Sequence, residues 1–283
     1  MVQEIDFKGI DSAWCPGCGD FGILNALKKA LVELGKTPEE MLFVSGIGQA
    51  AKLPHYIQGN VFNGLHGRAL PAATGAKIAN PKLNVIVTTG DGDCYGEGGN
   101  HFINAIRRNI NITLLVHNNG VYGLTKGQAS PTSQIGMKTK IDPSGVTAKP
   151  FQPLAAAIAL GCGFAARSFA GDLKLTVDLI KRAIQFKGFS FIDIFQPCPS
   201  FNPEKTFQWY TSHTYPLLKH DPSDKIKAFE KALDREDKMP LGLFYYEESE
   251  SFLEQALNMP DNELIEGTPS KEELYYVLVK QNM

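Results

Sequence analysis

The chain has 283 residues, of which 43% are apolar and 10% aromatic, enough to bury a sizeable core in one large or two small domains. Its 28 basic and 30 acidic side chains leave a net charge of −2, which argues against a protein that binds nucleic acid or an anionic membrane. The N-terminus shows no secretory pattern, and no uncharged apolar run approaches the roughly 18 residues of a membrane span. A cytoplasmic protein is therefore expected.

Helical and strand patterns alternate from about residue 20 to residue 196. Helices are predicted at 20–35, 68–79, 97–108, 153–160 and 173–186, and strands at 41–47, 83–89, 112–117, 163–169 and 190–195. This alternation is typical of an α/β domain with a mostly parallel sheet and helices on both faces. Asp20 is expected to cap the first helix.

Two regions do not follow the alternation. Residues 118–149 are rich in Gly, Ser, Thr, Pro and Lys and too long for a simple connector, so a functional or mobile loop is predicted. Residues 200–283 lack a regular pattern apart from predicted helices at 225–233, 251–257 and 272–279. We therefore expect an α/β domain over residues 1–199 and a C-terminal extension over 200–283 that wraps the core or a partner.

The sequence Gly90-Asp91-Gly92-Asp93 directly follows a predicted strand and precedes a helix. Glycines at the end of a strand let backbone amides approach a phosphate, and the helix N-terminus adds a positive partial charge. The carboxylates would repel that anion unless a divalent cation lies between them, which predicts a Mg²⁺-diphosphate site. Asn118 and Asn119 follow the next strand and are expected at the same sheet edge.

A Gly-Asp-Gly followed after about 25 residues by Asn-Asn, each at a strand end, resembles the thiamine diphosphate fingerprint. The resemblance implies that Asp91, Asn119 and the carbonyl of Val121 hold Mg²⁺. The plainer interpretation is a pair of tight turns between strands, because a Gly-Asp-Gly is common in loops.

The five cysteines are an odd number, which does not suit a disulfide framework. Cys15 and Cys18 form a Cys-Pro-Gly-Cys turn before a helix, whose N-terminus would lower their pKa values. Cys198, just past a predicted core strand, is a third candidate ligand. This spacing leaves zinc and iron–sulfur both open. Cys162 is expected to be a buried small side chain, and Cys94 to pack within the diphosphate turn.

Several segments together extend the resemblance to residues 12–202. They are WCPGCG, VSGIG, LHGRALPAATGAKIANP, GDGDCYGEGGNH, HNNGVYGLTKGQASPTS and QPCPS. In this order they closely resemble the β subunit of 2-oxoacid:ferredoxin oxidoreductases. The resemblance implies reversible oxidative decarboxylation of a 2-oxoacid on thiamine diphosphate, electron transfer through a 4Fe-4S cluster to ferredoxin, and release of an acyl-CoA.

The sequence departs from this family at one position. Many members read Gly-Ile-Gly-Cys where this chain has Gly46-Ile47-Gly48-Gln49, and that cysteine is the remaining cluster ligand. Either the fourth iron has another ligand, or the cluster is labile, or it is absent. His55 is the candidate for a replacement ligand, since imidazole ligates iron in some clusters; its plainer interpretation is a surface histidine.

The resemblance also implies where the catalytic acid lies. The acid that promotes cofactor activation is a glutamate of the neighbouring subunit, so this chain is expected to need an α subunit, as an α2β2 assembly. The residues themselves suggest His66, Arg68 and Lys126 as candidates for handling the substrate, and a cation at Lys126 would pair with the second carboxylate of 2-oxoglutarate and so favour it over pyruvate. The plainer interpretations are a satisfied core histidine for His66 and a solvated surface lysine for Lys126. The remaining expected cofactor-binding residues are Gly46, Ile47, Gly48, Gly90, Gly92, Asp93, Tyr122, Gly123 and Leu124.

Two other functions compete with this interpretation. One is a non-redox thiamine diphosphate decarboxylase or synthase that carries structural zinc on its cysteines. The other is a non-catalytic subunit that binds metal only to organise an assembly. A brown protein with broad absorbance near 400 nm would favour the oxidoreductase, because iron–sulfur clusters absorb there and zinc does not.

Overall fold

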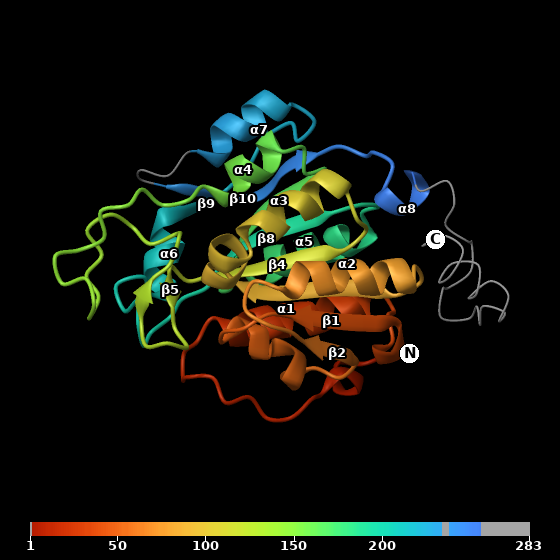
Figure 1. Cartoon of the computed structure of the whole chain (residues 1–283), viewed down its shortest axis with the longest axis horizontal. Coiled ribbons are helices and arrows are strands. Elements are labelled where there is room, and N and C mark those ends of the chain that lie inside the picture. The colour runs from red at the N-terminus through yellow and green to blue at the C-terminus, as the bar shows by residue number, and fades with distance from the viewer. Residues whose placement is uncertain (1, 234–237, 256–283) are drawn as a thin grey trace, which may run out of the picture.

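The computed structural model describes residues 2–233 and 238–255. Its main strands are β1 (Met41–Ser45), β2 (Asn60–Asn63), β3 (Asn84–Gly90), β4 (Thr113–Asn118), β7 (Phe164–Phe169), β8 (Ser190–Phe195), β9 (Thr214–Pro216) and β10 (Met239–Tyr246). They form one eight-stranded sheet in the order β2-β1-β3-β4-β8-β7-β10-β9 (Figure 1). Every neighbouring pair is parallel except β10 with β7.

Helices cover both faces of this sheet. One hydrophobic cluster joins it to α1 (Asp20–Glu33) and α5 (Leu173–Gln185). The other cluster joins it to α2 (Ala69–Ala79), α3 (Gly99–Arg108), α4 (Pro153–Ala159) and α7 (Lys225–Ala232). The remaining helices are α6 (Phe207–His213), α8 (Phe252–Gln255), the short 3-10 turns η1 (Glu4–Phe7), η2 (Pro38–Glu40) and η3 (Ala50–Tyr56), and a π-helical turn, η4 (Gly92–Glu97). The expected α/β fold with a mostly parallel sheet is confirmed.

The carboxyl ends of the central strands meet at one edge of the sheet. Strands β4, β7 and β8 are buried along their whole length, as expected for parallel strands covered on two faces. Gly90 at the end of β3 lies opposite His117 near the end of β4, and Ser45 at the end of β1 lies opposite Thr88. The loops that follow these strands are therefore neighbours, which is where ligands bind in open α/β sheets.

The part of the chain after residue 199, expected to be an extension, contributes strands to the main sheet. Strand β10 pairs with β7, and β9 pairs with β10, so two strands of this part of the chain complete the same sheet. The strand pattern of β10 was not evident because Pro240 and Gly242 interrupt it. The helix predicted at 272–279 lies outside the described residues. Within the described ranges, no helix combines the length and the apolar character needed to cross a bilayer.

A second missed element is β2, at the edge of the sheet. All four of its residues are exposed, so it shows no alternation of apolar and polar side chains. The long segment at 118–149 carries the short hairpin of β5 (Val121–Tyr122) and β6 (Gln128–Ala129). This hairpin brings Ser130 and Thr132 back beneath the end of β3, as their contacts with Asp91 show.

Candidate functional site

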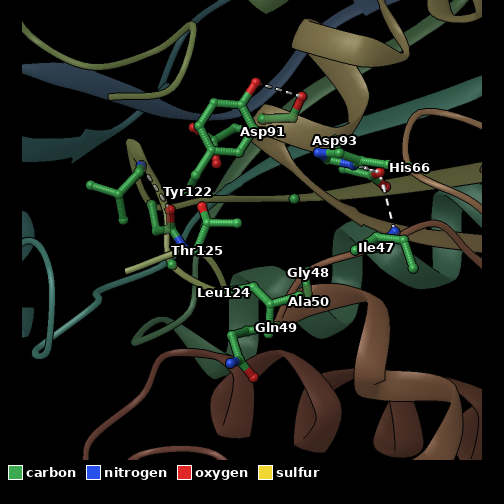
Figure 2. Close-up of a pocket in the computed structure, with 15 residues that line it drawn as sticks. Ile47, Gly48, Gln49, Ala50, His66, Asp91, Asp93, Tyr122, Leu124 and Thr125 are labelled. Carbon is green, nitrogen blue, oxygen red and sulfur yellow. Dashed lines mark hydrogen bonds and ion pairs between the residues drawn. The ribbon is translucent and has the colours of Figure 1, made fainter. Parts of the chain in front are cut away.

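A cavity of about 520 Å³ lies at the carboxyl edge of the sheet, between the loops that follow β1, β3 and β4 (Figure 2). Its lining residues are Ile47, Gly48, Gln49, Ala50, His66, Gly90, Asp91, Gly92, Asp93, Asn119, Val121, Tyr122, Gly123, Leu124 and Thr125. The structure therefore brings together nearly all of the residues that the sequence suggested for a cofactor.

Asp91 is a buried carboxylate at the start of the turn after β3, with 1% of its surface exposed. Its Oδ2 atom accepts hydrogen bonds from the hydroxyls of Ser130 and Thr132, each at 2.5 Å. Burial raises the pKa of Asp91 above its ordinary value, although the two hydroxyls act in the opposite direction. A buried carboxylate of this kind gains most from a cation, and Asp91 therefore fits the role of a Mg²⁺ ligand.

The other two predicted Mg²⁺ ligands follow β4. The side chain of Asn119 donates to the Gln196 side chain at 2.7 Å, and its Oδ1 accepts from the backbone amide of Val121 at 2.9 Å. Asn202 donates to the Asn119 carbonyl at 2.9 Å. These bonds fix the loop, and Asp91, Asn119 and Val121 all border the same cavity. Carboxylate, amide and carbonyl oxygens are the hard donors that Mg²⁺ prefers.

Asp93 organises the opposite wall of the cavity. Its Oδ1 accepts from the backbone amides of Ile47 at 3.2 Å and Gly67 at 2.7 Å, and Oδ2 accepts from the Thr89 hydroxyl. A side chain at Gly46 would collide with this carboxylate. Asp93 thus ties the loop after β1 to the turn after β3, a role that the sequence did not reveal because these residues are far apart in the chain.

His66 lines the cavity and lies between the carboxylates of Asp93 and Glu97; Figure 2 shows it beside Asp93. Its Nδ1 is 2.5 Å from Asp93, and its Nε2 is 3.2 Å from Glu97. Tyr122 packs edge-on against the His66 ring at 6.1 Å and donates to Glu97 at 3.1 Å. The two carboxylates orient both nitrogens of His66, so the residue is placed to hold a proton at the cavity.

The two cationic candidates, Arg68 and Lys126, do not line the cofactor cavity. Arg68 is exposed at the start of α2, and Lys126 is exposed in the turn between β5 and β6. Neither is among the described residues that line the cavity. Lys126 has a positive φ of 84°, uncommon for a residue with a side chain, and it lies next to Thr125, which does line the cavity.

A second cavity, of about 390 Å³, adjoins the first. Its lining residues are Trp14, Cys15, Cys18, Asp20, Gln49, Asn119, Gly123, Gln196, Cys198, Pro199, Ser200 and Phe201. We call it the cysteine cavity. Gln49, Asn119 and Gly123 line both cavities and so form their shared wall. The structure thus brings together the three cysteines that the sequence singled out.

The three cysteines line one cavity, but they are not grouped as the ligands of a single metal ion. Within residues 2–233 and 238–255, no three His, Cys, Asp or Glu side chains are grouped closely enough to hold one metal ion. His55 is exposed on η3 and is not among the described residues that line this cavity, so the structure does not bring it to the cysteines.

The sequence led us to expect lowered pKa values at the cysteine turn, but the pKa of the Cys18 thiol is raised. Burial raises the pKa of Cys18 above its ordinary value, and the nearby Asp20 carboxylate acts in the same direction. Burial also raises the pKa of Cys198. The expected effect of the helix N-terminus is therefore outweighed by desolvation. Any metal bound by these cysteines would displace their thiol protons, because thiolates rather than thiols ligate metals.

Asp20 does not cap α1 as expected. The cap residue is Gly19, and the Asp20 side chain points instead to His117 on β4, whose Nδ1 lies 2.6 Å away. Both side chains are almost fully buried. The thiol of Cys18 donates to the other Asp20 oxygen at 3.4 Å. This buried pair supports the wall of the cysteine cavity, and no local pattern could predict it because its members are 97 residues apart.

A further buried group connects the cofactor cavity to the core. Asp193 on β8 accepts from the Tyr95 hydroxyl at 2.9 Å and from the Asn118 side chain at 3.0 Å. Its other oxygen lies 3.9 Å from the guanidinium of Arg167, which is fully buried. Asn118 in turn accepts from Thr132, the residue that also donates to Asp91. The network thereby fixes the floor beneath the predicted Mg²⁺ site.

Comparisons with known proteins match nearly the whole chain. Residues 44–194 match a family model described as thiamine pyrophosphate enzyme, C-terminal TPP binding domain, and residues 198–260 match one for the C-terminal part of the pyruvate ferredoxin oxidoreductase beta subunit. A 2-oxoacid:ferredoxin oxidoreductase subunit beta from Saccharolobus solfataricus is 44% identical, over 92% of this chain and 90% of its own length. The 2-oxoglutarate oxidoreductase subunit KorB of Mycobacterium tuberculosis is 46% identical, over 67% of this chain and 51% of its own length.

A solved structure gives the same result. The 2-oxoglutarate:ferredoxin oxidoreductase from Magnetococcus marinus, with 2-oxoglutarate, coenzyme A and succinyl-CoA bound, superposes with a TM-score of 0.90 at 36% identity. The match covers 98% of this chain and 96% of that chain.

Proposed function

Because this chain belongs to the β-subunit family of the 2-oxoacid:ferredoxin oxidoreductases, we propose that with an α subunit it catalyses the reversible, coenzyme A-dependent oxidative decarboxylation of a 2-oxoacid. The preferred substrate is 2-oxoglutarate rather than pyruvate. Two electrons leave one at a time for ferredoxin, and the products are an acyl-CoA and carbon dioxide. Thiamine diphosphate supplies the carbanion-stabilising centre for this chemistry, and an iron–sulfur cluster supplies a one-electron carrier.

The shared wall between the two cavities is the observation that carries this proposal. The cofactor cavity holds the predicted Mg²⁺-diphosphate ligands, and the cysteine cavity holds three thiols. Gln49, Asn119 and Gly123 border both, so a single layer of residues separates them. A non-redox thiamine enzyme has no need of a thiol-lined cavity directly beside its cofactor. An oxidoreductase that passes electrons from substrate to a cluster requires this adjacency.

The residues of this chain have distinct roles in the proposed reaction. Asp91, Asn119 and the Val121 carbonyl would hold Mg²⁺ on the diphosphate, with Gly90 and Gly92 leaving room for it. A side chain at Gly92 would collide with the Tyr122 ring. His66, oriented by Asp93 and Glu97, would hold or move a proton at Nε2.

In the proposal, this site is completed by an α subunit. No glutamate is among the described residues that line the cofactor cavity, so the acid that thiamine chemistry needs would come from the partner. The rim of the cavity also exposes Leu124 and Thr125, which are then available to a neighbouring chain that covers the site. We propose for this reason that an α subunit covers the site, in the α2β2 assembly that the family resemblance implies.

The function is tested with the purified complex of this chain and its α subunit. We expect ferredoxin reduction that requires both 2-oxoglutarate and coenzyme A, and stoichiometric formation of succinyl-CoA. Pyruvate serves as the comparison substrate at equal concentration. Decarboxylation without ferredoxin reduction would instead identify a non-redox thiamine enzyme, and neither activity in a complex that binds no thiamine diphosphate would leave only an assembly role.

Lys126 is the residue proposed to favour 2-oxoglutarate. Its side chain is exposed beside the cofactor cavity, where an α subunit would reduce its access to water and strengthen an ion pair with the second substrate carboxylate. We expect Lys126→Ala to lower kcat/KM for 2-oxoglutarate roughly tenfold and to leave that for pyruvate unchanged, a difference of about 1.4 kcal/mol. Steady-state kinetics of the complex measure both values.

The matched control for this variant is Lys140→Ala, which removes an exposed lysine farther along the same segment. Because Lys and Ala both carry a Cβ, the change at residue 126 adds no new backbone strain at its positive φ. An unchanged ratio of the two kcat/KM values in Lys126→Ala would rule out this role for Lys126.

A further inference from the structure

We infer that the cysteine cavity holds its iron–sulfur cluster by three thiolates only, with the fourth iron facing Gln49 and therefore exchangeable. This inference rests on the proposed function and specifies its electron carrier. The ligands are Cys15, Cys18 and Cys198, which line the cavity from the turn before α1 and the loop after β8. Iron–sulfur cubanes usually have four cysteine ligands, so a three-thiolate site leaves one corner without a strong ligand.

The chain has no further cysteine that could complete the site. Its other two cysteines, Cys94 and Cys162, are both buried in the hydrophobic cluster beneath α2, α3 and α4. The thiol of Cys162 donates to the Phe164 carbonyl at 3.2 Å. Neither is among the described residues that line the cysteine cavity. All five cysteines lie in the described ranges, so this count is complete for the chain.

Two other polar side chains of the cavity, those of Asp20 and Gln196, are already engaged. One oxygen of Asp20 faces His117 at 2.6 Å, and the other accepts from Cys18. Gln196 donates to the Pro197 carbonyl at 2.7 Å and accepts from Asn119 at 2.7 Å. To ligate iron, either residue would have to give up hydrogen bonds that fix a buried part of the wall, which costs free energy.

Two polar side chains of the cavity are available, the amide of Gln49 and the exposed hydroxyl of Ser200, and Gln49 is the one that also borders the cofactor cavity. Its backbone carbonyl accepts from the indole of Trp14 at 2.9 Å, which fixes its position at the start of η3. Among the described residues none hydrogen-bonds to its side-chain amide. Gln49 also lines the cofactor cavity, so the corner that it faces lies toward the thiamine site. A neutral amide is a much weaker iron ligand than a thiolate.

This arrangement predicts a specific redox behaviour. Removal of one electron from a 4Fe-4S cluster of charge 2+ gives the 3+ state, which releases one Fe²⁺ from the corner without a thiolate. The product is a 3Fe-4S cluster of charge 1+, so iron, sulfide and charge all balance. Ferricyanide is the oxidant and accepts the electron. A fourth thiolate at the Gln49 position would hold the iron and block the conversion.

The test compares the wild-type complex with Gln49→Cys and Gln49→Ala variants. Each is loaded anaerobically with iron and sulfide, treated with one equivalent of ferricyanide and a chelator, and measured by electron paramagnetic resonance and iron analysis. We expect the wild type and Gln49→Ala to lose about one iron per cluster and to show the near-isotropic spin-half signal of a three-iron cluster. Gln49→Cys is expected to keep all of its iron and to show no such signal.

The outcomes separate this inference from the proposed function. A wild type that keeps all of its iron, or a Gln49→Cys variant that loses it, overturns the three-thiolate site while ferredoxin reduction still supports the function. If none of the three proteins binds iron and sulfide but thiamine diphosphate still binds, both the inference and the redox part of the function fail. Gln49→Ala is the control for Gln49→Cys, because it changes the same position without adding a ligand. It separates the effect of a new thiolate from the effect of losing the Gln49 side chain.

Discussion

Replacement of Asp91 by Asn is expected to abolish Mg²⁺-dependent binding of thiamine diphosphate without destabilising the chain that lacks cofactor. The carboxylate is buried beside two hydroxyls, and it is the only carboxylate among the three proposed Mg²⁺ ligands. A neutral amide cannot balance the cation, so affinity should fall at least about a hundredfold. Isothermal titration calorimetry with thiamine diphosphate in the presence of Mg²⁺ measures the loss.

The same substitution should change how stability depends on pH. Burial raises the pKa of Asp91 above its ordinary value of 3.8, so the folded chain binds this proton more tightly than the unfolded chain does. Stability without cofactor then falls as pH rises from about 4 through the raised pKa. Asp91→Asn removes that dependence, and its free energy of unfolding near neutral pH should equal or exceed that of the wild type.

The control for Asp91 is Asp178→Asn, a change of the same charge at an exposed position on α5. This variant should bind thiamine diphosphate like the wild type and keep its pH dependence. Cofactor binding by Asp91→Asn within a few-fold of the wild type would show that the diphosphate is held elsewhere, and the proposed function would lose its basis.

Replacement of Asp193 by Ala is expected to cost about 3–5 kcal/mol of stability, because it leaves the buried guanidinium of Arg167 without its carboxylate partner. It also removes the acceptor of the Tyr95 hydroxyl and of the Asn118 side chain. Since Asn118 connects to Asp91 through Thr132, thiamine diphosphate affinity should fall as well. Urea unfolding of the purified chain measures the first effect and calorimetry the second.

A double variant distinguishes loss of the ion pair from general damage to the core. In Asp193→Asn with Arg167→Met both charges are gone, and replacement of a buried ion pair by neutral groups is often close to neutral. The double variant should therefore recover most of the stability that Asp193→Ala loses. A loss below about 1 kcal/mol in Asp193→Ala would mean that the pair contributes little and that other contacts hold Arg167.

Local sequence patterns predicted most of the sheet, because the burial of these strands shows in the side chains of a few consecutive residues. Strands β3, β4, β7 and β8 are buried on both faces and read as short apolar runs, and the helices between them show apolar residues at helical spacing. Strand β2 is exposed throughout, and Pro240 and Gly242 interrupt β10, so neither has a pattern to detect. Only pairing with neighbours reveals such strands.

The sequence by itself determined the motifs of the site, namely the Gly-Asp-Gly turn with Asp91, the Asn pair with Asn119, and the cysteine positions. These motifs are informative because parallel strands end at the same edge of a sheet. Motifs that follow successive strands are therefore expected to lie close together in space. The resemblance to a known family added the identity of the expected cofactors. Together they were sufficient to expect a Mg²⁺-diphosphate site and a metal-binding set of cysteines.

Only the tertiary structure decided how the two cavities are built. It placed Gln49 rather than His55 at the cysteines, set Asp20 against His117 instead of at a helix cap, and made Asp93 a tie between two loops. Each of these contacts joins residues far apart in the sequence, and their energies depend on burial that no local pattern reports. Packing therefore decided which polar groups are paired in the core and which, like Gln49, still face a cavity.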